Sequence, residues 1–239
     1  MEIRIGTSGW SYPHWRGIFY PEKLSPGKWL QFYTEKFDTV ELNSTFYRLP
    51  KESTFNNWKK RTPVNFKWAI KASRFITHIK RLKDIAEPID RFFSRILNLK
   101  KKIGVILFQL PPTLKFEVTL LDNFLKKLPS DYRYGLEVRN LSWIDKKAFT
   151  LLKKYNIAFC ISDTAGRFPY IEKITTDFIY IRLHGSKELY ASDYTDEELM
   201  IWLEKIKTWN KDTYIYFDND ANGYAVKNAL KFKELFGSI

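Results

Sequence analysis

Charged residues end several short runs that are rich in β-branched and aromatic residues. The run "YGLEVRN" carries Glu137 and Arg139, and the run "YIRLHG" carries Arg182 and His184. In both runs the charged positions alternate with apolar ones. Carboxylates and imidazoles exchange protons with substrates, and guanidinium groups bind carboxylates and phosphates in bidentate fashion. If the fold collects these side chains, the sequence predicts acid–base chemistry on an anionic substrate.

The same reasoning extends to polar residues near the ends of the other runs. The candidate catalytic residues are Glu41, Glu137, Asp163, His184 and Asp218. The candidate substrate-binding residues are Asn43, Lys71, Gln109, Arg139, Arg182, Asn219, Asp220, Trp10, Tyr47 and Trp143. Side chains of a strand alternate between two faces, so the charged positions are expected to share one face and their apolar neighbours the other.

A repeated order of elements predicts how these residues are positioned. The strand-like runs cover residues 2–8, 39–47, 66–73, 103–112, 134–140, 157–164, 178–185 and 213–220. The segments with helical character cover residues 26–37, 51–61, 84–102, 117–128, 145–155, 195–209 and 222–236, of which 51–61 has the poorest apolar spacing. The link 165–176 lacks a helical pattern. Eight such units in 239 residues predict an α/β protein with one domain, residues 1–239: a TIM (β/α)₈-like barrel with a weak or missing helix between strands six and seven. An open doubly wound sheet is the alternative.

In a barrel the apolar strand face packs against the outer helices, and the polar face points inward. Because the polar residues come late in each run, they are expected to meet at the carboxyl-terminal mouth, where barrel enzymes hold their active sites. The alternative is an interior network of ion pairs, such as Glu137 with Arg139 or Glu41 with Lys71, that only fills the barrel. Buried ion pairs seldom stabilise a fold better than apolar packing, so a functional site is favoured.

Composition restricts the class of protein. The net charge of +13 and the pI of about 9.6 suit either a polyanionic partner or a solvated basic surface. The single cysteine, Cys160, excludes an intrachain disulfide and a thiolate zinc cluster, and its apolar neighbours predict a core position. Neither a membrane-spanning apolar run nor a signal-peptide pattern is present in the sequence, which predicts a cytoplasmic protein without a membrane partner. The sequence carries no signal for the oligomeric state.

Seven motifs together resemble the family called domain of unknown function 72. They are "IGTSGWSYPHWRGIFYP", "ELNSTFYRLP", "KASRFITHIKRL", "LFQLPP", "EVRNLSW", "YIRLHG" and "YFDNDANGYAVKNAL", and they span Ile5 to Leu230. The resemblance implies a TIM barrel with an active-site-like mouth built from these motifs, and it implies no reaction. Barrel nucleases and sugar isomerases of the endonuclease IV type have a similar fold but hold metals with many histidines. With only three histidines in this chain, no zinc cluster is expected.

Hydrolysis of a phosphate-bearing substrate, a nucleic acid or a sugar phosphate, is the first predicted function. Lys71, Arg139 and Arg182 would bind the phosphate oxygens. The carboxylates would act as general base or, together with Asp218, bind Mg²⁺ or Mn²⁺, and His184 would donate a proton.

Two other functions fit the same residues. Glu41 and Glu137 could flank a glycosidic bond as acid and base or nucleophile, with the rings of Trp10, Trp15, Tyr47 and Trp143 as stacking platforms. Basic residues interleaved with aromatics, as in "WSYPHWRGIFY", could instead bind a nucleic-acid strand without catalysis.

Overall fold

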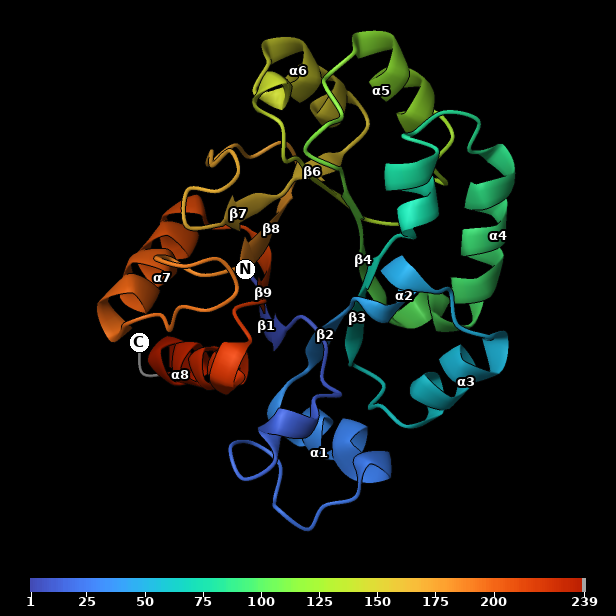
Figure 1. Ribbon diagram of the computed structural model, residues 1–239. Coiled ribbons are helices and arrows are strands. Elements are labelled where there is room, and N and C mark those ends of the chain that lie inside the picture. The colour runs from blue at the N-terminus through green and yellow to red at the C-terminus, as the bar shows by residue number, and fades with distance from the viewer. Residues whose placement is uncertain (238–239) are drawn as a thin grey trace.

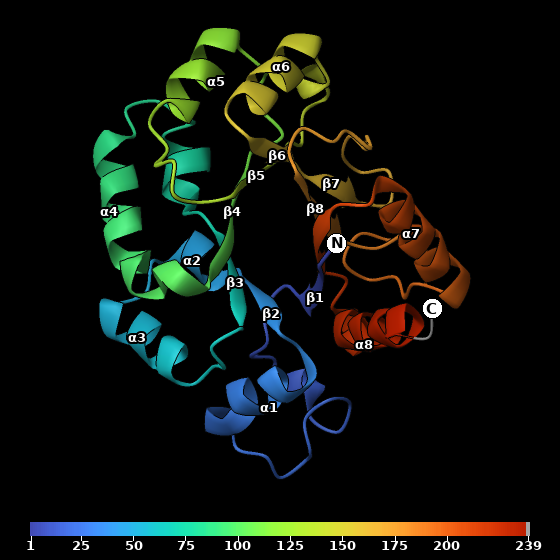
Figure 2. The ribbon, with the colours of Figure 1, turned by 180° about the vertical axis from the view of Figure 1, so that it is seen from behind.

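Parallel strands form the centre of the computed structural model, which describes residues 1–237, and helices lie outside them (Figures 1 and 2). The strands are β1 (Ile3–Thr7), β2 (Thr39–Leu42), β3 (Lys67–Lys71), β4 (Ile103–Gln109), β5 (Tyr134–Glu137), β6 (Ile157–Phe159), β7 (Ile161–Asp163), β8 (Phe178–Leu183) and β9 (Asp212–Phe217). They pair in two sheets, in the orders β1-β9-β8-β7 and β2-β3-β4-β5-β6, and every pairing is parallel.

The two sheets approach each other at two seams. At one seam Cys160 separates β6 from β7: its N–H donates to the carbonyl of Leu136 in β5 at 3.0 Å, and the next residue pairs with β8. At the other seam an isolated bridge joins Ser8 to Glu41. Since β6 and β7 form one run of chain, the strands make the predicted TIM-like ring, although the hydrogen-bonded ladder does not close around it.

Each predicted helical segment contains a helix. The helices are α1 (Trp29–Lys36), α2 (Ser44–Tyr47), α3 (Glu52–Lys60), α4 (Ala86–Ile96), α5 (Val118–Leu125), α6 (Lys146–Lys154), α7 (Asp196–Trp209) and α8 (Tyr224–Gly237). Short turns add η1 (Pro13–Trp15), η2 (Pro26–Lys28), the π-helical η3 (Phe75–Ile79), η4 (Leu97–Lys102), η5 (Leu141–Trp143) and η6 (Ala221–Gly223). Residues 164–177, between β7 and β8, contain no helix, which confirms that prediction.

One strand prediction extends too far. The run 39–47 was expected to remain extended, but β2 ends at Leu42 and the chain turns into α2 at Ser44. The hydroxyl of Thr45 contributes to this turn, because it lies 3.0 Å from the carbonyl oxygen of Leu42 and 2.6 Å from that of Lys71. This turn brings the residues after β2 over the end of β3, beside the ring.

Two apolar clusters hold the ring and its helices. The larger cluster lies between strands and helices, and the smaller consists of Ala69, Val105, Leu107, Ala158, Cys160, Phe178, Tyr180, Tyr214 and Tyr216. Strand alternation places this second cluster on the inward face that also carries Lys71, Gln109 and Arg182. The interior is therefore packed below the charged residues, which leaves the carboxyl ends of the strands for a site. In residues 1–237 no helix is both long and apolar enough to cross a membrane.

Candidate functional site

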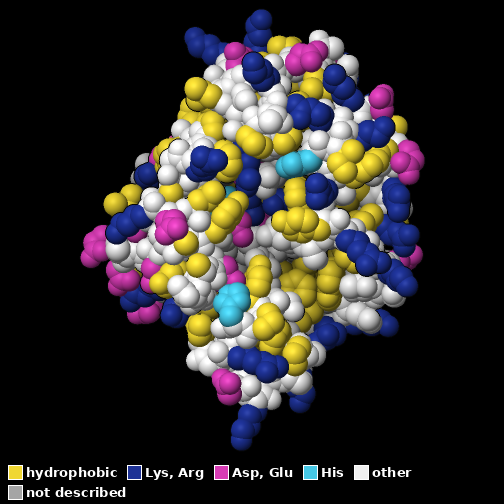
Figure 3. Space-filling view, viewed as in Figure 1, with side chains coloured by type: hydrophobic (Ala, Val, Ile, Leu, Met, Phe, Trp, Pro, Cys, Tyr) yellow, Lys and Arg dark blue, Asp and Glu magenta, His cyan; other side chains and the backbone are white. Residues whose placement is uncertain are grey.

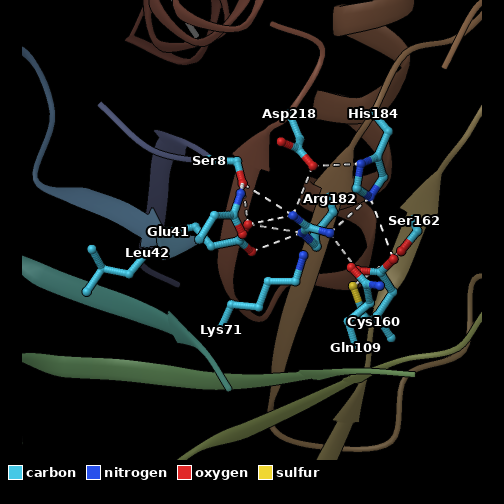
Figure 4. Close-up of polar contacts among 12 residues, drawn as sticks. Ser8, Glu41, Leu42, Lys71, Gln109, Cys160, Ser162, Arg182, His184 and Asp218 are labelled. Carbon is cyan, nitrogen blue, oxygen red and sulfur yellow. Dashed lines mark hydrogen bonds and ion pairs between the residues drawn. The ribbon is translucent and has the colours of Figure 1, made fainter. Parts of the chain in front are cut away.

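A charged network centred on Arg182 of β8 lies at the carboxyl ends of the strands (Figure 4). The guanidinium contacts Glu41 on one edge, with Nη2 to Oε1 at 2.6 Å and Nε to Oε2 at 2.9 Å. Its Nη1 donates to Oε2 of Glu137 at 2.6 Å, and its Nη2 donates to Oδ2 of Asp218 at 3.0 Å. Three strands thus deliver carboxylates to one cation, as the strand alternation predicts.

Burial and charge act in opposite directions on these carboxylates. The side chains of Glu41 and Arg182 are fully buried, and that of Glu137 is 1% exposed. Burial alone would raise the pKa of Glu137, but the charges of Arg182 and Arg139 outweigh it and hold the pKa well below its usual range. For Asp218 the same balance, with Arg182 as the main cation, lowers the pKa to about 2. Both groups are therefore ionised at neutral pH.

His184 lies beneath the mouth instead of at its edge. Its Nδ1 lies 2.9 Å from Oδ2 of Asp218, and its Nε2 lies 3.3 Å from Nη1 of Arg182. Within residues 1–237 this buried Nδ1 makes no hydrogen bond despite its short distance to Asp218. The side chain has no exposed surface. This burial counts against the predicted role of His184 as direct proton donor to a substrate.

Two residues that the sequence analysis missed complete the inner part of the network. The hydroxyl of Tyr180 donates to Oε2 of Glu41 at 2.6 Å, and the hydroxyl of Ser8 donates to Oε1 of the same carboxylate. Asn43 in turn donates to Ser8. Tyr180 precedes Arg182 by two positions, and Ser8 ends the run 2–8 on the face opposite Ile3 and Ile5, so strand alternation could have found both.

Arg139 reaches the outer edge of the network, where its side chain is 14% exposed. Its Nε donates to Oε1 of Glu137 at 3.1 Å, and its Nη2 lies 3.1 Å from Oε1 of Gln109 and 3.2 Å from the hydroxyl of Tyr190. Glu137 is thereby held between two guanidinium groups, one buried and one at the mouth. Gln109 acts as a support for Arg139.

Lys71 ends β3 and points toward Arg182 (Figure 4). Among residues 1–237 its amine makes no ion pair or hydrogen bond, and it lies 4.4 Å from the centre of the Phe46 ring. The residue keeps 7% of its surface exposed. The pKa of this amine is lowered to about 8, first by burial and second by the positive charge of Arg182.

Asp163 and Asp220 stand apart from the network. Oδ2 of Asp163 accepts from the hydroxyl of Tyr194 at 2.9 Å, and burial raises the pKa of Asp163. Oδ1 of Asp220 accepts from Nε1 of Trp15 at 2.8 Å, and Oδ2 lies 3.0 Å from Nε2 of His14. Burial raises the pKa of Asp220 to about 6. Trp15 is buried, so the structure corrects its predicted use as a stacking platform.

Asn219 and Trp143 were predicted to bind substrate, and the structure places both inside the protein. Asn219 follows Asp218 on the opposite face, where its Nδ2 donates to the carbonyl of Ser192 at 2.9 Å and to Oδ1 of Asn228 at 2.7 Å. Trp143 is buried, and its Nε1 donates to the carbonyl of Leu114 at 2.8 Å. Both predictions are corrected: these side chains hold loops to the body of the fold.

An aromatic cavity of about 490 Å³ adjoins the network. Asn43, which donates to Ser8, lines it together with Trp10, Tyr12, Tyr47 and Trp58. Figure 3 shows this face of the molecule, with charged side chains of both signs near its hollowed centre and hydrophobic side chains beside them. Trp10 and Tyr47 thus lie where a substrate ring in this cavity would contact them.

The carboxylates of the network are arranged around a cation of the protein itself. Glu41, Glu137 and Asp218 each direct an oxygen at Arg182 instead of converging on a shared point. Within residues 1–237 no group of three or more His, Cys, Asp or Glu side chains is arranged to hold a metal ion.

Fold and network together define a barrel-like α/β protein with a buried charged cluster under its carboxyl-terminal mouth. Residues 4–238 match the family described as "Protein of unknown function DUF72", and the chain belongs to this family. It is similar to UPF0759 protein YecE of Escherichia coli K12, with 28% identity covering 90% of this chain and 84% of that protein. UPF0759 protein YunF of Bacillus subtilis is 26% identical, covering 98% of this chain and 94% of the relative.

Solved structures agree with this assignment. A DUF72 family protein of Thermotoga maritima aligns with a TM-score of 0.91 and 31% identity, over 99% of this chain and 100% of that one. A DUF72 family protein of Enterococcus faecalis has the same fold, with a TM-score of 0.86 at 21% identity, over 98% of this chain and 95% of that one. The family resemblance expected from the motifs is confirmed. Its description assigns no reaction, so function must be argued from the site.

Proposed function

We propose that the protein is an enzyme that binds an anionic, phosphate-bearing substrate at the barrel mouth and hydrolyses it. The observation that carries this proposal is the amine of Lys71, which is nearly buried and has no anionic partner among residues 1–237. A charge in such a place costs free energy unless an opposite charge joins it. A phosphate group bound beside Lys71 would supply that charge.

The network separates supporting residues from residues that contact substrate. Arg182 is neutralised by three carboxylates and fully buried, so it positions its neighbours instead of holding phosphate as first predicted. Arg139 and Lys71 retain exposed surface at the mouth, with Asp218 as the one network carboxylate that is substantially exposed, at 18%. The two cations and one carboxylate at the mouth give a local excess of positive charge, which favours an anionic ligand. The overall charge of +13 adds to this positive potential.

The groups at the mouth suit hydrolysis of a phosphate ester. Asp218 is ionised, held by Arg182 and His184, and would orient the attacking water. Lys71, with a pKa of about 8, would protonate the leaving oxygen, since a general acid works best when its pKa lies near the working pH. Arg139 would bind two phosphate oxygens through its planar fork. Each role belongs to a side chain that reaches the mouth.

The first test measures binding of inorganic phosphate by calorimetry at low ionic strength. Lys71→Met and Arg139→Met are each expected to weaken binding by about tenfold to a hundredfold, because a charge-assisted hydrogen bond contributes about 1.5–3 kcal/mol. Lys60→Met, which removes an exposed charge from α3, serves as the matched control and should bind as the unaltered protein does. Equal affinities in the Lys71 and Lys60 variants would contradict the proposal.

The second test measures phosphate release from a panel containing a sugar phosphate, a nucleotide and an aryl phosphate. The unaltered protein should release phosphate from at least one class, and Asp218→Asn should abolish that release while phosphate binding remains. Absence of turnover across the panel, with phosphate still bound, would overturn hydrolysis and leave the anion site standing.

The geometry favours neither alternative function over this one. Glu41 and Glu137 lie on two sides of the Arg182 guanidinium and are at most 1% exposed, so a sugar cannot lie between them in this arrangement. Nucleic-acid binding without catalysis predicts an affinity that falls steeply with salt. Titration of a single-stranded oligonucleotide at several salt concentrations tests it.

A further inference from the structure

The amine of Lys71 has a second property besides its charge. We propose that Lys71 is a covalent nucleophile whose neutral amine attacks the carbonyl carbon of an aldehyde or ketone at the barrel mouth and forms an iminium. This inference goes beyond the proposed function and shares with it only the accessible amine. Protonated, the amine would bind phosphate; deprotonated, it would react with a carbonyl compound.

The first argument is the geometry around the amine. The amine lies 4.4 Å from the centre of the Phe46 ring of α2, and the charges that act on it come from five other parts of the fold: Glu41 of β2, His78 of η3, Glu137 of β5, Arg182 of β8 and Asp218 after β9. None of the three carboxylates pairs with Lys71, because each is engaged by Arg182. On its other side lies the apolar ring of Phe46. No ion pair therefore fixes the proton on the amine, while Arg182 repels it.

The second argument is that the amine can reach a ligand. Lys71 keeps 7% of its surface exposed, whereas Arg182 and His184, which share the cluster, keep none. Figure 4 shows the side chain extended from the end of β3 toward the network. A small carbonyl compound that enters the mouth would meet the amine before the buried part of the network.

The third argument is chemical. A desolvated lysine beside another cation is a recognised way to obtain a nucleophilic amine. With a pKa of about 8, about a tenth of Lys71 is neutral at pH 7, which is roughly two orders of magnitude more than for an ordinary lysine of pKa 10.4. The pKa of His78 is also lowered, to about 4, first by burial and then by the charges of Lys71 and Arg139. Burial and nearby cations therefore disfavour the protonated form of both side chains.

The step balances without an oxidant or reductant. The lone pair of Nζ forms a bond to the carbonyl carbon, the carbonyl π electrons move to oxygen, and a proton passes from nitrogen to that oxygen through solvent. The resulting carbinolamine takes up one proton from solvent and loses water, so a C–O bond breaks as the C=N⁺ bond forms. Hydrolysis reverses the sequence and restores the free amine.

Reductive trapping tests the inference on the full chain. The protein is treated with glycolaldehyde and cyanoborohydride at pH 7, to a low extent of labelling, and the modified lysines are located by peptide mass spectrometry. Lys71 is expected to be labelled about a hundredfold faster than exposed lysines such as Lys60, and its rate should rise with pH and level off above about pH 8. Labelling of Lys71 no faster than Lys60 would overturn the inference.

Two measurements on the unaltered protein separate this inference from phosphate binding, and one variant controls for the label. Lys71→Arg cannot form an iminium, because guanidinium is not deprotonated in proteins. We expect this variant to lose the selective label. Phosphate binding without selective labelling in the unaltered protein would reject the nucleophile alone. Selective labelling without phosphate binding would reject the phosphate site alone. Both outcomes are measured on the unaltered protein, so neither depends on whether a variant folds.

Discussion

Replacing Arg182 by methionine gives the sharpest test of the network. Methionine occupies a similar volume without charge, so the substitution leaves Glu41 and Glu137 buried beside an apolar side chain. Removing one partner of a buried ion pair typically costs about 3–5 kcal/mol, because the remaining charge loses its compensation. Glu41 keeps its hydrogen bond from Tyr180, and Glu137 keeps Arg139. Because of these remaining contacts, we expect the free energy of unfolding to fall by about 3 kcal/mol, near the lower limit of that range.

The assay is urea unfolding followed by circular dichroism at several pH values. A loss of about 3 kcal/mol corresponds to a melting temperature about 6–12 °C lower for a chain of this size. Arg139→Met, which alters the partly exposed guanidinium, should cost about 1 kcal/mol or less, because Arg182 still neutralises Glu137. Adding Glu41→Gln to Arg182→Met should restore part of the loss, since no unpaired charge then remains on that side.

The two proteins should also respond differently to acid. In the unaltered protein the pKa of Glu137 is lower when folded than when unfolded. Its stabilising contribution is therefore present above the unfolded pKa, about 4.3, and is lost as the pH falls further. Without Arg182 the pKa of Glu137 loses the largest of the charges that lower it, so the variant should lose less unfolding free energy than the unaltered protein as the pH falls below about 4.3. A folded Arg182→Met variant with a loss below about 1 kcal/mol, and with an unchanged pH response, would refute the reasoning.

Three further predictions concern other parts of the chain. Burial raises the folded pKa of Asp220 to about 6, so between about pH 4 and pH 6 the folded state holds a proton that the unfolded chain has lost. The unfolding free energy should therefore fall as the pH rises through this range, and Asp220→Asn should remove that fall. An unchanged pH slope in urea unfolding would contradict this. Thr195→Ala should cost about 1 kcal/mol in the same assay, since Thr195 and Glu198 cap the start of α7 reciprocally, and Thr195→Ser should recover most of it. Burial raises the pKa of the Cys160 thiol, so a disulfide reagent should modify it only as the native protein opens, and rapid modification of the folded protein would exclude this burial.

Local periodicity explains what could be read from the sequence. A strand exposes alternate residues to opposite faces whatever its partners are, so Glu41, Lys71, Glu137 and Arg182 could be assigned to one inward face. The order of strands and helices, and the absence of a helix pattern before β8, likewise follow from the chain alone. The same rule had a limit at β2, where side-chain hydrogen bonds of Thr45 end the extended run earlier than β propensity suggests.

Only the tertiary structure decided which of these charges reach the mouth. Glu41 and Arg182 are separated by 141 positions, and no spacing rule gives their distance or the water excluded around them. Desolvation and Coulomb interactions depend on that distance and exclusion. Burial removes Arg182 and His184 from the surface, whereas Lys71 makes no ion pair among residues 1–237 and has a lowered pKa. Asn219 and Trp143 were misplaced for the same reason, because residue type indicates hydrogen-bonding capacity but the packed fold determines which partner satisfies it. The sequence determined which residues share a face, and the packed fold determined which of them remain available to a ligand.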